Sequence, residues 1–132
     1  MLNDARTGQV GRKDDIKALQ ERMKRFGLGV IHMTEKLPST RAANIISAQI
    51  VRSGTSPGAN YRAACRARSK AEFIAKMGIV EEELDETLYW LEVLVEAILL
   101  AEKDAEPLAS EGNELLSIVV ASIKTARKSP SR

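Results

Sequence analysis

Apolar residues recur at steps of three and four over residues 73–98, and this run constrains the fold more than any other feature of the sequence. The spacing is the period of a helix that buries one face, and it excludes the period-two alternation of a half-buried strand. Ser69, with Glu72 three residues later, has the form of a capping box at the start of such a helix. The residues predicted to face the core are Phe73, Met77, Val80, Leu84, Leu88, Leu91, Val95 and Ile98.

The segment over residues 14–37 has the same spacing. It passes Gly27 and Gly29 without a change of phase, which predicts one long helix with a neighbouring helix close to the glycines. Pro38 is expected to end this helix, because proline cannot continue the backbone hydrogen bonds. The residues predicted to face the core are Ile16, Leu19, Met23, Phe26, Val30, Met33 and Leu37.

The next helix is predicted to begin after a cap at Ser39 or Thr40. Two arrangements fit its second half, the stretch SGTSPGAN at residues 53–60. One is a loop between two short helices, and the other is a single long helix with a kink at Pro57, where the backbone donor is missing. The spacing of apolar residues does not separate them. The residues predicted to face inward are Ala43, Ile46, Ile50 and Ala64.

A last helix is predicted to carry Pro107 in its first turn and to reach residue 128. Four helices with short connections predict an all-α, antiparallel, up-down-up-down four-helix bundle, and 132 residues suit one domain. The inward residues of the last helix are predicted to be Leu108, Leu115, Val119 and Ile123. We expect a flexible N-terminal arm at residues 1–13, the bundle at 14–128 and a C-terminal tail at 129–132.

Several classes of function find no support in the sequence. The single cysteine, Cys65, permits no intrachain disulfide, and the one histidine, His32, belongs to no catalytic triad or Glu-x-x-His metal motif. The first fifteen residues lack the apolar core of a signal peptide, and no apolar run approaches the roughly 20 residues that cross a bilayer. We therefore expect a non-enzymatic, cytoplasmic protein without a metal, a cofactor or a membrane partner.

Charge is distributed unevenly along the chain. Every charged residue from Lys36 to Lys70 is basic, and every one from Glu81 to Glu86 is acidic. Cations without acidic neighbours can neutralise phosphates, although most charged helical residues only face water, and a formal net charge of +2 is small for a nucleic-acid binder. Tyr61 offers the one ring for base stacking within the basic run. The candidate nucleic-acid-binding residues are Arg41, Arg62, Arg66, Arg68 and Lys70.

Polar residues in the middle of the second helix share one face, at steps of three and four. This face fits a ligand site, but its small residues favour a polar seam inside the bundle or between subunits. Arg52 would need a carboxylate if it were buried, and Glu86 of the third helix is the predicted partner. The residues assigned to a structural or subunit interface are Gln49, Arg52, Ser53, Ser56, Pro57, Asn60, Glu86 and Trp90.

Several of these segments together match the pattern of a known family. They are Leu37-Pro38, then QIVRSGTSPGAN at residues 49–60 and SKAEFIAKMGIVEEELDETLYWLE at residues 69–92. On these residues the chain resembles the bacterial four-helix-bundle proteins encoded by intervening sequences of large-subunit ribosomal RNA genes. The accessory variability protein of diversity-generating retroelements is related to this group. The pattern covers about residues 16–126, and Arg62 departs from it by standing where the family usually has an acidic residue.

The resemblance implies a left-handed bundle whose second helix is kinked near Pro57 and which assembles into a homopentamer. It implies no cofactor and no catalysis. Retroelement members are basic, bind nucleic acid and associate with a reverse transcriptase, so RNA, DNA and such an enzyme are the implied partners. Two functions stay open for this chain. One is a non-enzymatic oligomer that binds nucleic acid through a basic surface, and the other is a structural or protein-interaction bundle with no nucleic-acid role.

Overall fold

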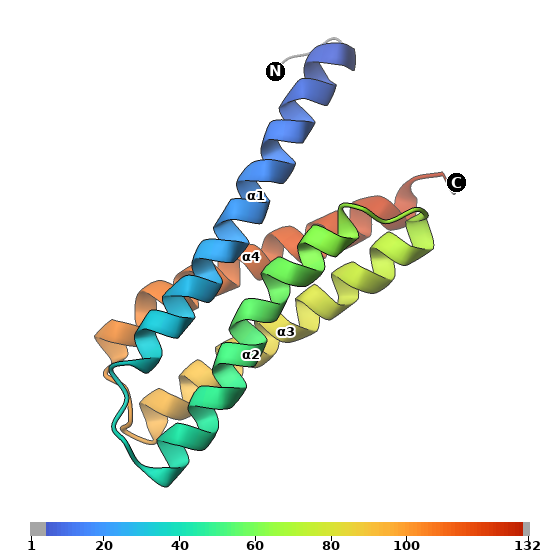
Figure 1. Ribbon diagram of the computed structural model, residues 1–132. Helices are drawn as coiled ribbons and strands as arrows, with labels where there is room; N and C mark the ends of the chain where they lie inside the picture. Colours follow the sequence, from blue (N-terminus) through green and yellow to red (C-terminus); the bar gives the residue numbers. More distant parts are fainter. Residues whose placement is uncertain (1–4, 131–132) are drawn as a thin grey trace.

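The computed structural model of the protein describes residues 5–130, with side chains described from residue 12 onward. It contains four helices, α1 (Ala5–Thr34), α2 (Arg41–Ala64), α3 (Lys70–Glu96) and α4 (Glu102–Lys128), and the described residues form no strand. Each helix runs antiparallel to the one before it (Figure 1). α2 packs between α1 and α3, and α4 packs on α3 and, less extensively, on α1. The predicted all-α four-helix bundle is confirmed.

The core lies between the four helices and is mainly aliphatic, with three methionines and the aromatic residues Phe26 and Tyr61. The periodic residues predicted from the sequence supply most of it, and those that are not fully buried, such as Leu19, Phe73 and Leu88, pack against it. The largest fully buried aliphatic and methionine side chains are Met23, Val30, Ile50, Met77, Val80, Leu84, Leu94, Leu115 and Val119. Leu94 was not predicted, because both a step of three and a step of four from Leu91 reach an apolar residue, and the prediction took Val95 at the step of four.

Two predicted helix caps are confirmed. The Thr40 hydroxyl accepts a hydrogen bond from the amide of Ala43 at 3.2 Å, and the Ser69 hydroxyl accepts one from Glu72 at 3.0 Å. The Glu72 carboxylate in turn accepts from the amide of Arg68 at 3.1 Å, one residue before the cap. Both caps satisfy amides that the first turn of a helix leaves without partners, and they fix where α2 and α3 begin.

Ile98 was predicted to lie in the core, and this prediction is wrong. α3 ends at Glu96, and Ile98 is 90% exposed with φ at 59°. The Leu99 amide donates to the carbonyl of Leu94 at 2.9 Å and the Ile98 amide to that of Val95 at 3.0 Å, the two bonds of a Schellman motif. The apolar spacing continues past this turn, so it could not locate the end of the helix.

α2 is continuous through Pro57, so the alternative of a loop between two short helices is wrong. Pro57 is buried, and its missing N–H leaves the carbonyl of Ser53 without the usual intrahelical donor. Nearby side chains bond to the helix backbone, with Thr55 Oγ1 donating to the carbonyl of Val51 at 2.7 Å. The kink near Pro57 stays a prediction.

Two helices begin earlier than predicted. α1 begins at Ala5, so residues 5–13 of the expected arm are helical, while residues 1–4 lie outside the described residues. Figure 1 shows this part of α1 projecting past the end of the bundle. α4 begins at Glu102, which places Pro107 beyond the first turn of the helix.

Glycines bring α1 and α2 into close contact, as the sequence predicted for Gly27. A Cβ atom at Gly27 would lie 3.2 Å from the carbonyl oxygen of Gly54, and a Cβ atom at Gly54 would lie 2.8 Å from Cγ2 of Val30. Gly58, one turn further along α2, faces the backbone of Met23. The two helices therefore approach each other in the middle of α2 without room for larger side chains.

Candidate functional site

A groove of about 530 Å³ lies between α1 and α2. Its α1 wall carries Lys17 and Lys24, and its α2 wall carries Arg62 and Arg66. Glu21 is the one carboxylate among its lining residues. The groove begins beside the glycine contact and continues to where α1 and α2 diverge (Figure 1). The close contact of α1 and α2 at the glycines thus places four cations on the two facing walls of the groove.

Most of these cations are not neutralised within the described part of the chain. Glu21 lies 3.6 Å from Lys24 Nζ and 3.4 Å from Arg25 Nε, which are pairs along α1 itself. Lys17, Arg62 and Arg66 are exposed and form no ion pair with any described residue. The groove is therefore strongly electropositive.

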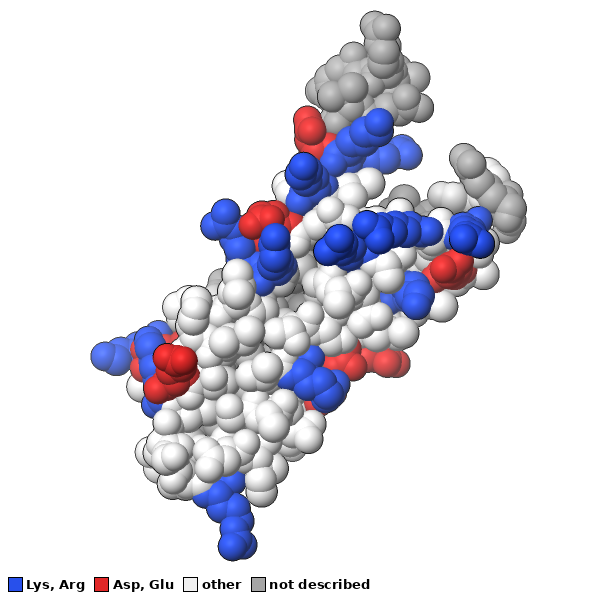
Figure 2. Space-filling model, viewed as in Figure 1, with Lys and Arg blue, Asp and Glu red and all other residues white. Residues whose placement is uncertain are grey.

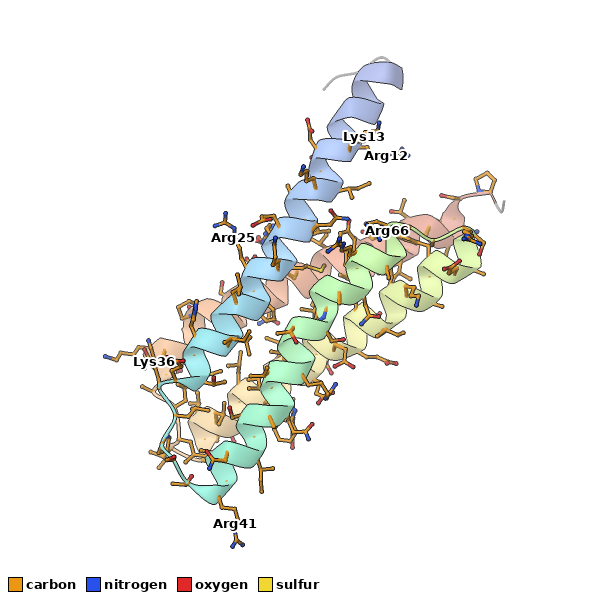
Figure 3. All side chains as sticks on the ribbon, viewed as in Figure 1. Arg12, Lys13, Arg25, Lys36, Arg41 and Arg66 are labelled. Atoms are coloured by element: carbon orange, nitrogen blue, oxygen red, sulfur yellow. The ribbon has the colours of Figure 1, made fainter. Side chains whose placement is uncertain are left out.

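Further cations extend this charge over one face of the molecule. Figure 2 shows Lys and Arg side chains gathered over α1 and the end of α2, with few acidic residues among them. Figure 3 places Arg12 and Lys13 on the projecting part of α1 and Arg66 at the end of α2. We define the basic surface by eight exposed residues, which are Arg12, Lys13, Lys17, Lys24, Arg25, Arg62, Arg66 and Arg68.

Arg68 joins this surface through a second hollow, of about 520 Å³, which it lines together with Arg12 and Lys70. Lys70 has a different environment, because its Nζ donates to the carbonyl of Arg127 at 3.1 Å and to that of Ser129 at 2.6 Å. These are among the last carbonyls of α4 and the residue that follows, groups that a helix end leaves without intrahelical donors. Lys70 thus fastens the end of α4 to the start of α3.

Arg41 is not brought together with the other candidates. It is the first residue of α2, and Figure 3 shows it at the opposite end of the bundle from Arg66. The helical rise separates Arg41 from Arg62 by roughly 30 Å. The basic run of the sequence is therefore divided between two ends of the molecule.

Sequence reasoning missed the α1 half of the basic surface, namely Arg12, Lys13, Lys17, Lys24 and Arg25. These cations are interspersed with Asp14, Asp15 and Glu21, so the linear sequence shows no unopposed run there. A signal was nevertheless present, because Lys17, Gln20 and Lys24 follow each other at steps of three and four on one helical face. All three line the groove.

Tyr61 does not offer the expected stacking ring, because it is 5% exposed and belongs to the core. Burial, and then a hydrogen bond with Cys65, raise the pKa of the Tyr61 phenol above its ordinary value. The exposed aromatic residue, Tyr89, lies on α3 and packs edge-to-face with Trp90, their ring centroids 5.1 Å apart. Tyr61, Tyr89 and Trp90 are all absent from the lining of the groove.

The predicted pairing of Arg52 with Glu86 is present between α2 and α3. Arg52 also donates to Glu83, with Nη1 2.9 Å from Oε1. Its side chain is 49% exposed, so the cluster lies at the edge of the bundle rather than in the core. The Arg52 guanidinium, and next the Trp90 indole N–H, which donates to Glu86 Oε2 at 3.0 Å, lower the pKa of the Glu86 carboxyl.

A buried hydrogen bond lies beneath this cluster. The hydroxyls of Ser53 and Thr87 are 2.9 Å apart, and Thr87 donates to the carbonyl of Glu83 at 2.8 Å. Ser53 and Thr87 are the buried polar side chains among the described residues. Thr87 was missed by the sequence reasoning, since it lies within an apolar run where one threonine has no distinct signal.

Two of the remaining polar candidates of α2 bond to each other within the helix, and the third faces outward. Asn60 Nδ2 donates to the hydroxyl of Ser56 at 2.8 Å and to its carbonyl at 3.1 Å. Gln49 is exposed and makes no side-chain hydrogen bond with the described residues. No group of three or more metal-ligating side chains gathers in the described chain. None of the four helices, as far as they are described, has the length and hydropathy to cross a membrane.

Comparison with known proteins tests the resemblance. A family model described as the 23S rRNA-intervening sequence protein matches residues 15–121. A protein of unknown function from the S23 ribosomal protein family of Bacteroides thetaiotaomicron has a similar crystal structure, with 31% identity and a TM-score of 0.76 over 83% of this chain and 97% of that chain. The comparison with curated proteins gave no match. The family match spans most of the bundle, and the chain therefore belongs to the 23S rRNA-intervening sequence protein family.

Proposed function

We propose that the protein is a non-enzymatic binding protein that engages nucleic acid through its basic surface. The observation that carries this proposal is the groove between α1 and α2, whose facing walls hold Lys17, Arg62 and Arg66 without ion-pair partners among the described residues. Phosphate oxygens are the ligands that such exposed cations bind, with an affinity that depends on salt rather than on base sequence.

The distribution of charge supports this proposal more than the net charge does. The basic surface holds eight cations, and Asp14, Asp15 and Glu21 are the acidic residues on the same stretch of α1. Elsewhere, Arg22 and Arg52 are bound by glutamates of the neighbouring helix. The small net charge of +2 is therefore a sum over neutralised and basic regions. Arg41 and Lys70 are not part of the proposed interface.

Self-association would strengthen such binding. A homopentamer, as the resemblance implies, would repeat the basic surface in every subunit and raise avidity without new contacts. A reverse transcriptase or another nucleic-acid enzyme is the protein partner that this proposal includes.

A structural or protein-interaction bundle is the second candidate, and exposed apolar residues favour it. Ile45 at the start of α2 is 59% exposed, and Ile98 after the end of α3 is 90% exposed. Both lie at the end of the bundle opposite the basic surface, since α2 begins where the antiparallel α3 ends. An assembly that covered this end would account for their exposure without any nucleic acid.

The test compares two charge-matched variants by anisotropy with labelled RNA and DNA at about 50 and 200 mM salt. Arg62→Ala/Arg66→Ala removes two cations of the groove, and Arg41→Ala/Lys103→Ala removes two exposed cations at the opposite end. We expect the groove variant to bind about tenfold more weakly and its log–log salt slope to fall by about 2, with the control close to wild type.

Light scattering verifies that both variants keep the mass of the wild-type protein. Absence of binding by the intact protein at low salt would overturn the proposal and leave the structural bundle as the better account. Equal losses in the two variants would also overturn it, because they would show a nonspecific response to net charge.

A further inference from the structure

We infer that the basic surface recognises the phosphate backbone of a paired nucleic-acid helix and not the bases of an unpaired strand. This inference rests on the proposed function and narrows its ligand. It follows from where the aromatic side chains lie, how the cations are spaced and what lines the groove.

Proteins that hold unpaired strands combine a basic groove with aromatic rings on which successive bases stack. The chain has five aromatic residues, and the structure describes all of them. Phe26 and Tyr61 are buried in the core. Tyr89 and Trp90 pack on each other on α3, where Glu86 binds the Trp90 indole and would repel a phosphate backbone.

Phe73 is the one aromatic residue that borders the basic surface. It lines the hollow shared by Arg12 and Arg68, but its side chain packs against the hydrophobic core. The groove between α1 and α2 has no aromatic residue among its lining. A strand bound there would gain phosphate contacts without the roughly 1–3 kcal/mol per base that stacking supplies elsewhere.

The cations themselves are arranged on two straight helical walls. Lys17 and Lys24 are seven residues apart on α1, or roughly 10 Å, and Arg62 and Arg66 are four residues apart on α2, or roughly 6 Å. Lys13, Lys17 and Lys24 share one face of α1 and extend over roughly 17 Å, the length of about five base pairs. Such a surface is long enough to follow the backbone of a duplex.

Charge density then decides between the two ligands. A duplex carries one phosphate per about 1.7 Å of its axis, twice the density that one of its strands supplies alone. Cations that are fixed on helices gain more binding energy from the denser phosphates of the duplex. No aromatic ring in the groove would offset the weaker phosphate contacts of a single strand by stacking on its bases. The duplex is therefore the better ligand of the basic surface.

An acidic segment of another protein is the competing ligand. Leu28 and Ile31, which are 47% and 38% exposed, line the inner end of the groove and would suit an amphipathic helix. The cations continue beyond the groove to Arg12, Lys13 and Arg68, however, where these apolar residues do not reach. That extent favours a long, uniform polyanion over a short peptide helix.

The experiment measures the affinity of the full-length protein for a duplex of about 20 base pairs and for unstructured thymidine strands of about 20 and about 40 nucleotides. The longer strand carries about the same total charge as the duplex. We expect the duplex to bind about fivefold or more tightly than the strand of equal total charge. Phe73→Met, Phe73→Leu and Tyr89→Ala should leave both affinities within about twofold of wild type. Polyglutamate of matched charge should compete poorly.

Each outcome has a distinct meaning. Equal or tighter binding of the unpaired strand, or its selective loss in a folded Phe73 variant, would overturn this inference and leave the proposed function standing. Failure to bind either nucleic acid would overturn both. Competition by polyglutamate as strong as that by the duplex would overturn the inference in favour of an acidic protein partner.

Discussion

α2 packs against its two neighbours by different means. Toward α3 the contact is polar, with Arg52 held by two glutamates above the buried hydrogen bond between Ser53 and Thr87. Toward α1 the contact runs through glycines, and the described side chains form no hydrogen bond or ion pair between these two helices. The charges of α2 are thus neutralised on one side and left available on the other.

A second arginine of the bundle is also neutralised by two glutamates of a neighbouring helix. Arg22 of α1 donates to Glu111 at 2.8 Å and also binds Glu114, two glutamates of α4 three residues apart. Arg52 binds Glu83 and Glu86 of α3, which have the same separation. Arginine thus serves the fold where the facing helix supplies two carboxylates at one turn's spacing. Arg62 and Arg66 stay available for a ligand because Glu21, the one carboxylate that lines their groove, pairs with Lys24 and Arg25 of its own helix.

The largest effect is expected at the glycine contact, which Gly54→Ala would break. The new methyl group would lie 2.8 Å from Cγ2 and 2.9 Å from Cγ1 of Val30, a buried residue whose χ1 is fixed by its helix. Overpacking of this kind costs about 1–3 kcal/mol. Gly78→Ala is the matched control, because a Cβ atom there meets nothing within 4 Å and should stabilise α3 by about 1 kcal/mol.

Chemical denaturation of the two variants checks this expectation, with circular dichroism as the signal. Gly54→Ala should unfold at a lower denaturant concentration than Gly78→Ala. Equal stability of the two would mean that α1 shifts freely away from α2, and the α1–α2 contact would then not be what holds the groove walls in place.

A smaller effect is expected on the polar side of α2. Thr87→Val keeps the shape of the side chain but removes the donor to the carbonyl of Glu83 and one of two partners of the Ser53 hydroxyl, which also donates to the carbonyl of Ile50 at 3.4 Å. Because Ser53 keeps this second partner, the loss should be about 1 kcal/mol, the low end of the cost of an unpaired buried polar group, and removal of both hydroxyls should cost little more. The double variant Ser53→Ala/Thr87→Val should therefore lose less stability than the sum of the single variants, as measured by urea unfolding. Additive losses would contradict the coupling.

The ion pair above that hydrogen bond should contribute less, because Arg52 is half exposed and surface pairs are screened by water and salt. Arg52→Ala and Glu86→Ala should each lower the melting temperature slightly, and the double variant should lower it by less than the sum. Arg62→Ala is the matched control, since it has no carboxylate partner in the described chain. Its melting temperature should stay at the wild-type value, and a loss as large as that of Arg52→Ala would erase the distinction between paired and available arginines.

The sequence alone predicted the features that depend on local spacing. The four helices, the caps at Thr40 and Ser69, and most of the core follow from steps of three and four and from capping chemistry, which involve neighbours a few residues apart. Ile98 shows the limit of this reasoning, because a periodic pattern does not register the Schellman turn that ends α3.

The candidate site was predicted only in part, for a physical reason. Arg62 and Arg66 were identified from an unopposed basic run, and Glu86 was correctly named as the partner of Arg52. Lys17 and Lys24 were missed because they join the groove only when α1 packs across α2 at the glycines. Which cations are available depends on the carboxylates of the facing helix, and that is a property of packing rather than of the linear sequence.

The smallest effect is a difference in acid sensitivity between the two sides of α2. Arg52 first, and Trp90 next, lower the pKa of Glu86 below its ordinary value of 4.5 in the folded protein. A carboxyl whose pKa is lower in the folded than in the unfolded state stabilises the fold above its unfolded pKa. That stability is lost as the pH falls through the folded pKa. Glu86→Gln should therefore reduce the decline in stability below about pH 4.5, measured by urea unfolding at successive pH values, whereas Arg62→Ala should leave the profile unchanged. If the two variants had the same acid profile as wild type, the carboxylates of α3 would contribute nothing through ionisation, and the polar side of α2 would depend on the buried hydroxyls alone.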